Sequence, residues 1–343
     1  MRTIPISAEN NYQIEVDVDW RVSLADWTEG RKNVLVICSE HFPVDVDFPI
    51  IQIPDGEAGK SISSLQTIWQ KCAENGLGRD DVIVAIGGGA ITDVAGFAAA
   101  TWLRGIDWIA IPTTLAGMVD ASIGGKTAIN SNAGKNLIGS FHSPKAVLMD
   151  TSWLKSLTPR DFAAGLAEVI KCGFIQDLHI LELLKSKKLV DVIDNDELIV
   201  ELIFRAANVK AEVVSQDFKE SFKREILNYG HTLGHAIEKH SNYQLRHGEA
   251  ISIGLCFAAE LSHLKAGLNY ESVSLHYELL EAMNLPTKYL ANAWPDLEIL
   301  MNSDKKNRNG QLRFVGLTAP GNCNRIENPN SMDLSQAYER IAL

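Results

Sequence analysis

Short apolar runs constrain the fold of this chain more than any other feature. Each run has the length of a buried strand. They comprise residues 33–38, 81–89, 107–114 and 146–150. Between the first two runs, apolar residues from Ile62 to Cys72 recur at helical spacing, and Asn75-Gly76 supplies a helix stop. Strand, helix and strand in this order predict an α/β fold with a mostly parallel sheet covered by helices.

The sequence pattern changes near residue 158. Thr158 and Pro159 form a start signal for a new helix. Beyond them the periodicity is helical over long stretches such as residues 196–217, and a polar turn at 304–314 leads into a late strand. A length of 343 residues exceeds one small core. We therefore expect an α/β domain over residues 1–158 and a mostly α-helical domain over residues 159–343.

Composition excludes several classes of function. The formal net charge is −11, from 43 acidic and 32 basic residues, so nucleic-acid binding is not expected. No apolar run approaches the ~20 residues of a membrane span, and residues 1–17 lack the apolar core of a signal peptide. The cysteines are odd in number and lack a Cys-x-x-Cys pair, which favours a reducing compartment, the cytoplasm. They are Cys38, Cys72, Cys172, Cys256 and Cys323.

A glycine-rich turn follows the second apolar run, in the segment "AIGGGAITDVAGF" at residues 85–97. Such a turn brings backbone N–H groups close to a phosphate at a helix N-terminus. It differs from the dinucleotide fingerprint, because Thr92 stands where a third glycine belongs. The alternative is a tight turn without a ligand. Three consecutive glycines directly after a run of apolar residues favour the phosphate site.

Residues 118–141 are rich in Gly, Asn, Lys and Ser, and we expect a long functional loop there. Lys126 and Lys135 each stand beside a glycine, as a flexible ammonium group that reaches an anion would. The alternative is an exposed surface loop. Apolar side chains are expected to anchor the segment, namely Ile123, Ile129, Leu137 and Ile138.

Two charged residues interrupt an otherwise apolar helical segment at residues 164–175. Glu168 and Lys171 stand at i, i+3 and therefore share one helix face. Charged side chains are rarely buried unless they are paired or bound to something. An internal ion pair and a ligand site are equally compatible with this segment alone.

Residues 226–250 hold four of the nine histidines. Spacings of 4, 3 and 4 would place Arg224, Asn228, His231 and His235 on one helical stripe, which we interpret as a cleft wall. Mid-helix glycines at 230 and 234 would each cost about 1 kcal/mol, which suggests close approach of a ligand or backbone. His247 precedes another apolar helix. Single histidines are more often ordinary core or surface residues, but several together with a glutamate favour a divalent metal.

These segments together resemble the 3-dehydroquinate synthase family. The resemblance runs in family order from about residue 55 to 250, and residues 304–314 extend it. Its combination of motifs is specific, whereas no single motif would be. The matching segments are "DGEAGK" (55–60), "GGGAITDVAGF" (87–97), "RGIDWIAIPTTLAGMVDASIGGKTAIN" (104–130), "GKNLIGSFHSP" (134–144), "AGLAEVIK" (164–171), "REILNYGHTLGHAIE" (224–238) and "RHGEAISIGL" (246–255).

The resemblance implies an N-terminal Rossmann-like NAD-binding α/β domain and a C-terminal helical domain that binds a metal. It implies a homodimeric lyase of the shikimate pathway that uses NAD and Zn²⁺, for which Co²⁺ can substitute. The reaction converts 3-deoxy-D-arabino-heptulosonate 7-phosphate to 3-dehydroquinate and phosphate. It proceeds by transient oxidation by NAD, phosphate elimination, re-reduction and intramolecular aldol closure.

The resemblance also implies roles for individual residues. The metal ligands are Glu168, His231 and His247, whereas His240 has no family role and is expected to be exposed. Cofactor contacts fall on Asp55, Gly56, Glu57, Ala58, Gly59, Lys60, Gly89, Ala90, Ile91, Thr92, Asp93, Thr113, Thr114, Lys126, Lys135, Trp153, Leu154, Lys155 and Ser156. Catalytic groups are Asp120, Lys126, Lys171, Arg224, Asn228 and His235. Further substrate contacts are Arg104, Lys135, Asn136, Lys210, Glu220 and Lys306, with Lys305 as the alternative to Lys306.

Two departures from the family pattern, Cys172 and His142-Ser143, affect no proposed catalytic position. Three rival functions fit the sequence less well. A cyclase for a substrate without a carboxylate would not need Lys210, Arg224 and Asn228 together. A metal-dependent alcohol or glycerol dehydrogenase would produce NADH and leaves residues 124–141 unexplained. A non-catalytic NAD sensor would not need all three metal ligands.

Overall fold

The computed structural model describes residues 1–42, 44–219, 223–305 and 312–343. The chain divides into two compact units. Unit 1 contains residues 1–157 and 210–219, and unit 2 contains residues 158–209 and the described residues after 222. Within the described ranges, no helix is both long and apolar enough to cross a membrane.

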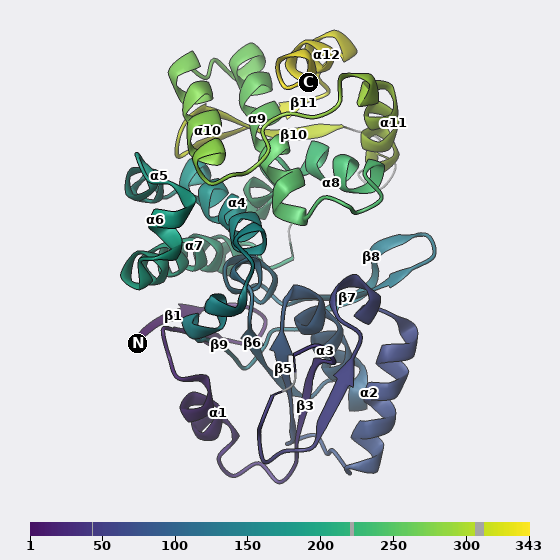
Figure 1. Ribbon diagram of the computed structural model, residues 1–343. Coiled ribbons are helices and arrows are strands. Elements are labelled where there is room, and N and C mark those ends of the chain that lie inside the picture. The colour runs from purple at the N-terminus through teal and green to yellow at the C-terminus, as the bar shows by residue number, and fades with distance from the viewer. Residues whose placement is uncertain (43, 220–222, 306–311) are drawn as a thin grey trace. The chain divides into compact units, whose positions relative to one another are not determined.

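Unit 1 is built on a seven-stranded sheet in the order β1-β2-β9-β6-β5-β3-β4, in which only the β1–β2 pair is antiparallel (Figure 1). The four predicted strands are confirmed as β3, β5, β6 and β9, whereas β1, β2 and β4 were not predicted. The strands are β1 (Arg2–Ile6), β2 (Tyr12–Val16), β3 (Val34–Ser39), β4 (Ile50–Ile53), β5 (Val82–Gly87), β6 (Asp107–Pro112) and β9 (Ala146–Met149).

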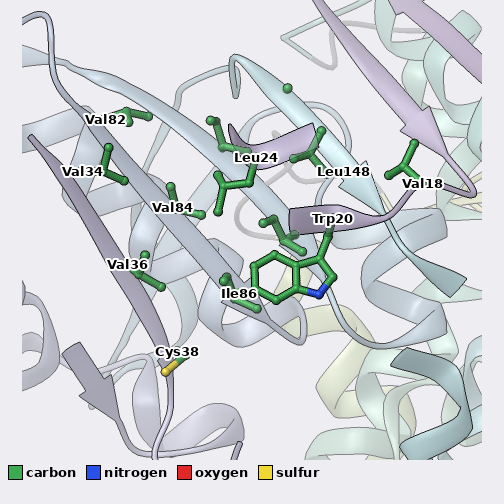
Figure 2. Packing of buried hydrophobic residues seen from close by; sticks show 13 residues of the cluster. Val18, Trp20, Leu24, Val34, Val36, Cys38, Val82, Val84, Ile86 and Leu148 are labelled. Carbon is green, nitrogen blue, oxygen red and sulfur yellow. The ribbon is translucent and has the colours of Figure 1, made fainter. Parts of the chain in front are cut away.

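Helices cover this sheet, and a cluster of buried apolar side chains fills one face. Alternate residues of β3 and β5 point the same way and meet Trp20 and Leu24, as expected for a period of two (Figure 2). The helices of unit 1 are α1 (Trp20–Thr28), α2 (Ile62–Glu74) and α3 (Gly89–Thr101). Short helical turns are η1 (Gly56–Gly59), η2 (Trp102–Arg104), η3 (Gly117–Ala121) and η4 (Thr151–Ser156).

The strand order identifies a switch point in the sheet. From β3 the chain continues to β4 on one side, whereas β5 lies on the other side of β3 and leads on to β6. In open parallel sheets, ligands bind beyond the carboxyl ends of the strands at such a point. The glycine turn at Gly87–Gly89 follows the carboxyl end of β5, next to this switch point.

The segment predicted as a long loop instead forms η3 and a hairpin of β7 (Lys126–Ser131) with β8 (Gly134–Phe141). Ile123 and Ile129 are buried as expected. The predicted anchoring by Leu137 and Ile138 is wrong, because these side chains are 58% and 46% exposed. They are consecutive residues of β8 and therefore point to opposite faces of the two-stranded ribbon, and residues 136–141 are exposed on both faces.

Unit 2 is mostly helical, with a two-stranded sheet of β10 (Arg313–Ala319) and β11 (Asn322–Glu327). The predicted helix start at Thr158-Pro159 is confirmed. The Thr158 hydroxyl accepts from the N–H of Asp161, and Pro159 is the first residue of the helix. The helices are α4 (Pro159–Ile175), α5 (Leu178–Leu184), α6 (Leu189–Ile193), α7 (Asp196–Gln216), α8 (His231–His240), α9 (His247–Ala266), α10 (Tyr270–Ala282), α11 (Trp294–Lys305) and α12 (Ser331–Arg340), with turns η5 (Lys223–Asn228) and η6 (Ala291–Ala293). Residues of α7 from 210 onward belong to unit 1.

Glycines let α9 approach its neighbours closely. A Cβ at Gly248 would lie 1.7 Å from the carbonyl oxygen of Ala164 in α4. A Cβ at Gly254 would lie 2.0 Å from the carbonyl oxygen of Gly230, which precedes α8. These two contacts set the distance of α9 from α4 and from the start of α8, and these three helices carry the predicted metal ligands.

The predicted helical stripe from Arg224 to His235 is wrong in part. Arg224 and Asn228 lie in η5, and α8 begins only at His231. Gly230 separates the two segments with a φ of 79°, in the left-handed region that glycine adopts without strain. Gly230 is therefore a helix-start residue, not a residue in mid-helix as the sequence pattern suggested.

Candidate functional site: a metal-donor cluster and the strand ends of unit 1

Glu168, His231 and His247 lie together in unit 2, each on a different helix. One potential ligand atom from each residue lies within 4.8 Å of the others. Nε2 of His247 is 3.0 Å and Nε2 of His231 is 3.6 Å from Oε1 of Glu168. Two imidazole nitrogens and one carboxylate oxygen form the donor set of catalytic zinc sites, which leave further positions open. The residues present therefore fit a divalent transition-metal ion.

The ring of His231 is oriented by the backbone. Its Nδ1 lies 3.1 Å from the carbonyl oxygen of Tyr229, to which it donates. This bond leaves the Nε2 lone pair directed at the Glu168 carboxylate. Burial and the neighbouring Lys171 ammonium hold the pKa of His231 well below its usual range, so this imidazole is neutral and able to bind a metal.

The ring of His247 lies between two carboxylates. Nε2 contacts Glu168, and Nδ1 lies 3.3 Å from Oε2 of Glu238. Burial lowers the pKa of His247, but the hydrogen bonds to Glu168 and Glu238 outweigh it and raise the pKa to about 10. Metal binding at Nε2 therefore releases a proton from this ring.

Glu168 is 1% exposed, and its second oxygen forms an ion pair with Lys171 one turn along α4. The internal ion pair, one of the two alternatives that the sequence left open, is thus present, and it coexists with the donor cluster. Burial raises the pKa of Glu168, but Lys171 and the two histidines outweigh it and hold that pKa well below its usual range. The carboxylate is therefore ionised, as a metal ligand must be.

Ion pairs that were not predicted from the sequence join the start of α4 to the start of α9. Arg160 donates to both carboxylate oxygens of Glu249, at 2.5 and 2.8 Å. Arg246 pairs with Asp161. Glu249 also accepts from the backbone N–H of Arg246, three residues before it, at 2.8 Å. That spacing resembles a capping box and was a signal available in the sequence.

The remaining predicted residues of unit 2 occupy different environments. His235 is exposed, and its ring centroid lies 5.3 Å from that of His231 and 6.1 Å from that of His247. Arg224 is 2% exposed, so its guanidinium does not belong to an exposed surface ion pair. His240 is half-buried and bonds the Tyr289 hydroxyl at 2.9 Å, so its predicted exposure is wrong. Glu220 and Lys306 lie outside the described residues, and the side chain of Lys305 is likewise not described.

In unit 1, the predicted cofactor residues follow the carboxyl ends of the parallel strands. Residues 55–60 follow β4, residues 89–93 follow β5, Thr113-Thr114 follow β6, and residues 153–156 follow β9. Gly88, the residue before α3, has no side chain to cap the first turn, and a Cβ there would lie 3.3 Å from Thr114. A helix N-terminus of this kind attracts phosphate. These residues fit a dinucleotide at the strand ends.

Lys60 links two other predicted residues at this edge. Its side chain is 3% exposed, and its ammonium contacts Oδ2 of Asp93 at 2.5 Å and donates to Oδ1 of Asn136. Burial raises the pKa of Asp93 to about 6, although the Lys60 ammonium opposes the rise. Lys135 lies 3.6 Å from Glu57. The turn after β4, the start of α3 and the β7–β8 hairpin are thereby joined.

Asp120 and Lys210 form a second linked pair in unit 1. The Lys210 ammonium lies 2.5 Å from both the backbone oxygen and Oδ1 of Asp120.

The remaining predicted residues of unit 1 lie in different environments. Arg104 and Lys126 are exposed, and Arg104 has a left-handed φ of 70°. Trp153 packs against Trp20 and Phe42, with ring centroids 5.7 and 5.2 Å apart. Its indole therefore belongs partly to the core.

Known families match this chain over most of its length. The model of the 3-dehydroquinate synthase N-terminal family matches residues 50–164, and that of the C-terminal family matches residues 165–307. The chain belongs to the 3-dehydroquinate synthase family. A curated 3-dehydroquinate synthase from Mycolicibacterium vanbaalenii is 51% identical over 99% of this chain and 98% of its own length.

Solved structures support the dehydroquinate synthase-like fold. A crystal structure of 2-deoxy-scyllo-inosose synthase with carbaglucose-6-phosphate, NAD⁺ and Co²⁺ is 26% identical, with a TM-score of 0.86 over 98% of this chain and 99% of that one. An iron-containing alcohol dehydrogenase from Corynebacterium glutamicum has a TM-score of 0.70 at 15% identity, covering 99% of this chain and 96% of that one. The second likeness concerns the fold alone.

Proposed function

We propose that this chain is a 3-dehydroquinate synthase, an NAD- and divalent-metal-dependent lyase. It converts 3-deoxy-D-arabino-heptulosonate 7-phosphate to 3-dehydroquinate and phosphate. The observation that carries the proposal is the 51% identity to a 3-dehydroquinate synthase over 99% of the chain. The donor cluster of Glu168, His231 and His247 supports it, because a member that had lost the activity would not need to keep this set.

We assign the cofactor to unit 1 and the metal to unit 2, with domains at residues 1–158 and 159–343. Glu168, His231 and His247 would hold Zn²⁺ or Co²⁺, and the strand-end residues of unit 1 would hold NAD. When bound, NAD accepts a hydride and later returns it, and the divalent ion acts as a Lewis acid on substrate oxygens. The chain itself contributes binding, orientation and proton movement.

The substrate carries a carboxylate and a phosphate, and the basic residues among the proposed site residues suit both anions. Arg224 presents a planar fork that matches either anion with two parallel hydrogen bonds. Its burial keeps that interaction from being screened by water. Lys171 is held by Glu168, and Lys210 by Asp120, so both ammonium groups are positioned before the substrate arrives.

His235 and Asp120 are the proposed proton carriers. The His235 ring lies beside both ligand histidines, so its nitrogens can exchange a proton with a hydroxyl group near the metal ligands. Asp120 bears a carboxylate that Lys210 orients, which can accept a proton from a substrate oxygen. Asn228 supplies an amide able both to donate and to accept.

We also propose a cytoplasmic homodimer. The exposed apolar side chains of Leu137 and Ile138 on β8 support association of two copies. Five free cysteines, four of them buried, support a reducing compartment. Light scattering of the purified protein tests the dimer, and a monomer mass at micromolar concentration would contradict it.

The proposed activity is tested by incubating the purified protein with the heptulosonate phosphate, NAD and Zn²⁺ and measuring phosphate release. Phosphate should be released in step with 3-dehydroquinate formation, and chelation should abolish both.

Two further substrates distinguish this activity from the rival cyclase and dehydrogenase functions. Turnover of a heptulose phosphate lacking the carboxylate, with none of the heptulosonate phosphate, would assign the chain to another cyclase activity. Steady NADH production from a simple polyol would favour a dehydrogenase.

A further inference from the structure

The ring of His247 bonds to a carboxylate that is not in the proposed ligand set. Nδ1 lies 3.3 Å from Oε2 of Glu238, whose side chain is 12% exposed. The two residues are nine positions apart and lie on different helices, α8 and α9. The opposite ring nitrogen, Nε2, contacts Glu168. One imidazole therefore joins the ligand carboxylate to a second carboxylate behind it.

When Nε2 of a neutral imidazole binds a metal, the single ring proton is on Nδ1. The hydrogen-bond partner of Nδ1 therefore determines how strongly this tautomer is favoured. An ionised carboxylate can only accept, so Glu238 favours the form with the proton on Nδ1 and holds the ring in one orientation. His231 has the same arrangement, with the carbonyl oxygen of Tyr229 as acceptor. Each ligand histidine thus has its own acceptor, and that of His247 is a side chain.

A rival explanation is a second metal ion. His235, Glu238 and His247 also place one potential ligand atom each within 4.8 Å of one another. That site would use Nδ1 of His247 while Nε2 serves the first metal, so the ring would have to lose both protons. It would also break the existing bond between Nδ1 and Glu238. The geometry favours an orienting carboxylate over a second ligand set.

We propose that Glu238 is a positioning residue of the metal centre, which accepts a hydrogen bond from Nδ1 of His247 and fixes Nε2 toward the metal. The inference rests on the proposed metal site and extends it. Removing such an orienting partner typically weakens metal binding 10- to 100-fold. The proposal concerns metal affinity and does not require Glu238 to touch the substrate.

The test is a Zn²⁺ titration of the metal-free full-length protein against a competing chelator. Glu238→Gln keeps the size of the side chain but loses its charge, and its amide can offer N–H groups to Nδ1. We expect Zn²⁺ affinity to fall about tenfold or more in Glu238→Gln, and up to 100-fold in Glu238→Ala. Glu182→Gln is the matched control, because Glu182 pairs with His179 at 2.8 Å on the exposed face of α5. Its affinity should equal that of the wild type.

A spectroscopic readout separates positioning from mere packing. With Co²⁺ bound, the visible absorption bands should shift in Glu238→Gln and stay unchanged in Glu182→Gln. Wild-type affinity and spectrum in Glu238→Gln would overturn the inference. Two Zn²⁺ ions per wild-type chain, falling to one in Glu238→Gln, would overturn it in favour of a second metal site. If His231→Ala retains the metal, the ligand set of the proposed function fails, an outcome distinct from failure at Glu238 alone.

Discussion

Nε2 of His247 lies 3.0 Å from Oε1 of Glu168, although the two residues are 79 positions apart in the chain. The contact joins the start of α9 to the middle of α4. The same carboxylate oxygen also lies 3.6 Å from Nε2 of His231, so Glu168 faces both histidines of the predicted ligand set. The donor cluster is thus an assembly of three helices rather than a local motif.

The ligand set predicts which single substitutions remove the metal. Glu168→Ala, His231→Ala and His247→Ala should each lose bound Zn²⁺ after dialysis, because two donors do not hold the ion tightly. His240→Ala should retain about one Zn²⁺ per chain, since His240 bonds Tyr289 instead. Elemental analysis of the purified variants measures this. Metal loss in His240→Ala with retention in His247→Ala would refute the set.

Because α9 lies close to α4, substituting alanine for Gly248 should lower the free energy of unfolding. Alanine normally stabilises a helix relative to glycine by about 1 kcal/mol. In Gly248→Ala the new Cβ would meet the Ala164 carbonyl oxygen at 1.7 Å, so the helices must separate. We expect a loss of roughly 1–3 kcal/mol of unfolding free energy together with weaker Zn²⁺ binding.

Urea unfolding and metal titration of Gly248→Ala test this expectation. Gly78→Ala is the control, because the nearest atom to a Cβ there is 3.5 Å away, an ordinary contact. A Gly248→Ala protein as stable as the wild type, with unchanged metal affinity, would show that the helix spacing does not position the ligands.

The buried side chain of His276 should make the folding stability of the protein depend on pH. Burial lowers the pKa of His276 to about 4, although a hydrogen bond to the Ser272 carbonyl oxygen opposes this. The ring stacks on Phe174 with centroids 3.5 Å apart, and its Nε2 accepts from the Tyr229 hydroxyl. Between pH 4 and 6.5 the unfolded chain binds more protons at this residue than the folded one. Stability should therefore rise with pH across that window.

The expected size of this effect is on the order of 3 kcal/mol, because the pKa falls from 6.5 to about 4 and one pKa unit is worth about 1.4 kcal/mol. Urea unfolding of the wild type and His276→Gln at several pH values between 4 and 7 measures it. His276→Gln should be less stable at pH 7 and should lose part of the slope. An identical slope in both proteins would assign the acid sensitivity to other groups.

Substituting Arg224 should weaken substrate binding without weakening metal binding. Arg224→Lys keeps the charge but loses the planar fork, and charge-assisted hydrogen bonds are worth roughly 1.5–3 kcal/mol each. We expect kcat/KM to fall on the order of tenfold to a hundredfold with full Zn²⁺ and NAD binding. Steady-state kinetics and elemental analysis check this. Wild-type kcat/KM would remove Arg224 from the substrate site.

The parts of the fold that follow from local spacing were predicted, and those that depend on distant contacts were not. The strands β3, β5, β6 and β9 are continuous apolar runs because parallel strands are covered on both faces. The strand β1, "RTIPI", escaped prediction because it is short and contains a proline. The anchoring by Leu137 and Ile138 was wrongly predicted because an apolar residue type does not reveal whether another element covers it, and β8 is exposed on both faces at these positions.

The candidate site shows the same division. The spacing of Arg224, Asn228 and His231 suggested one helix, but the positive φ of Gly230 breaks it, and a glycine's φ is not readable from its neighbours. Glu238 was missed because its role depends on His247, which only the packing of α8 on α9 brings near. The metal ligands themselves came from the resemblance, since spacing alone left open which histidines belong together.

The proposed conversion is redox-neutral, and the fate of the NAD hydride distinguishes it from a net oxidation. Purified protein with Zn²⁺, excess heptulosonate phosphate and an NAD concentration far below that of substrate should release phosphate until the substrate is consumed. Absorbance from NADH should not accumulate during turnover, because each hydride is returned. Phosphate release that stops when NAD is exhausted, with NADH formed in equal amount, would show that the hydride is not returned and that the conversion is not redox-neutral.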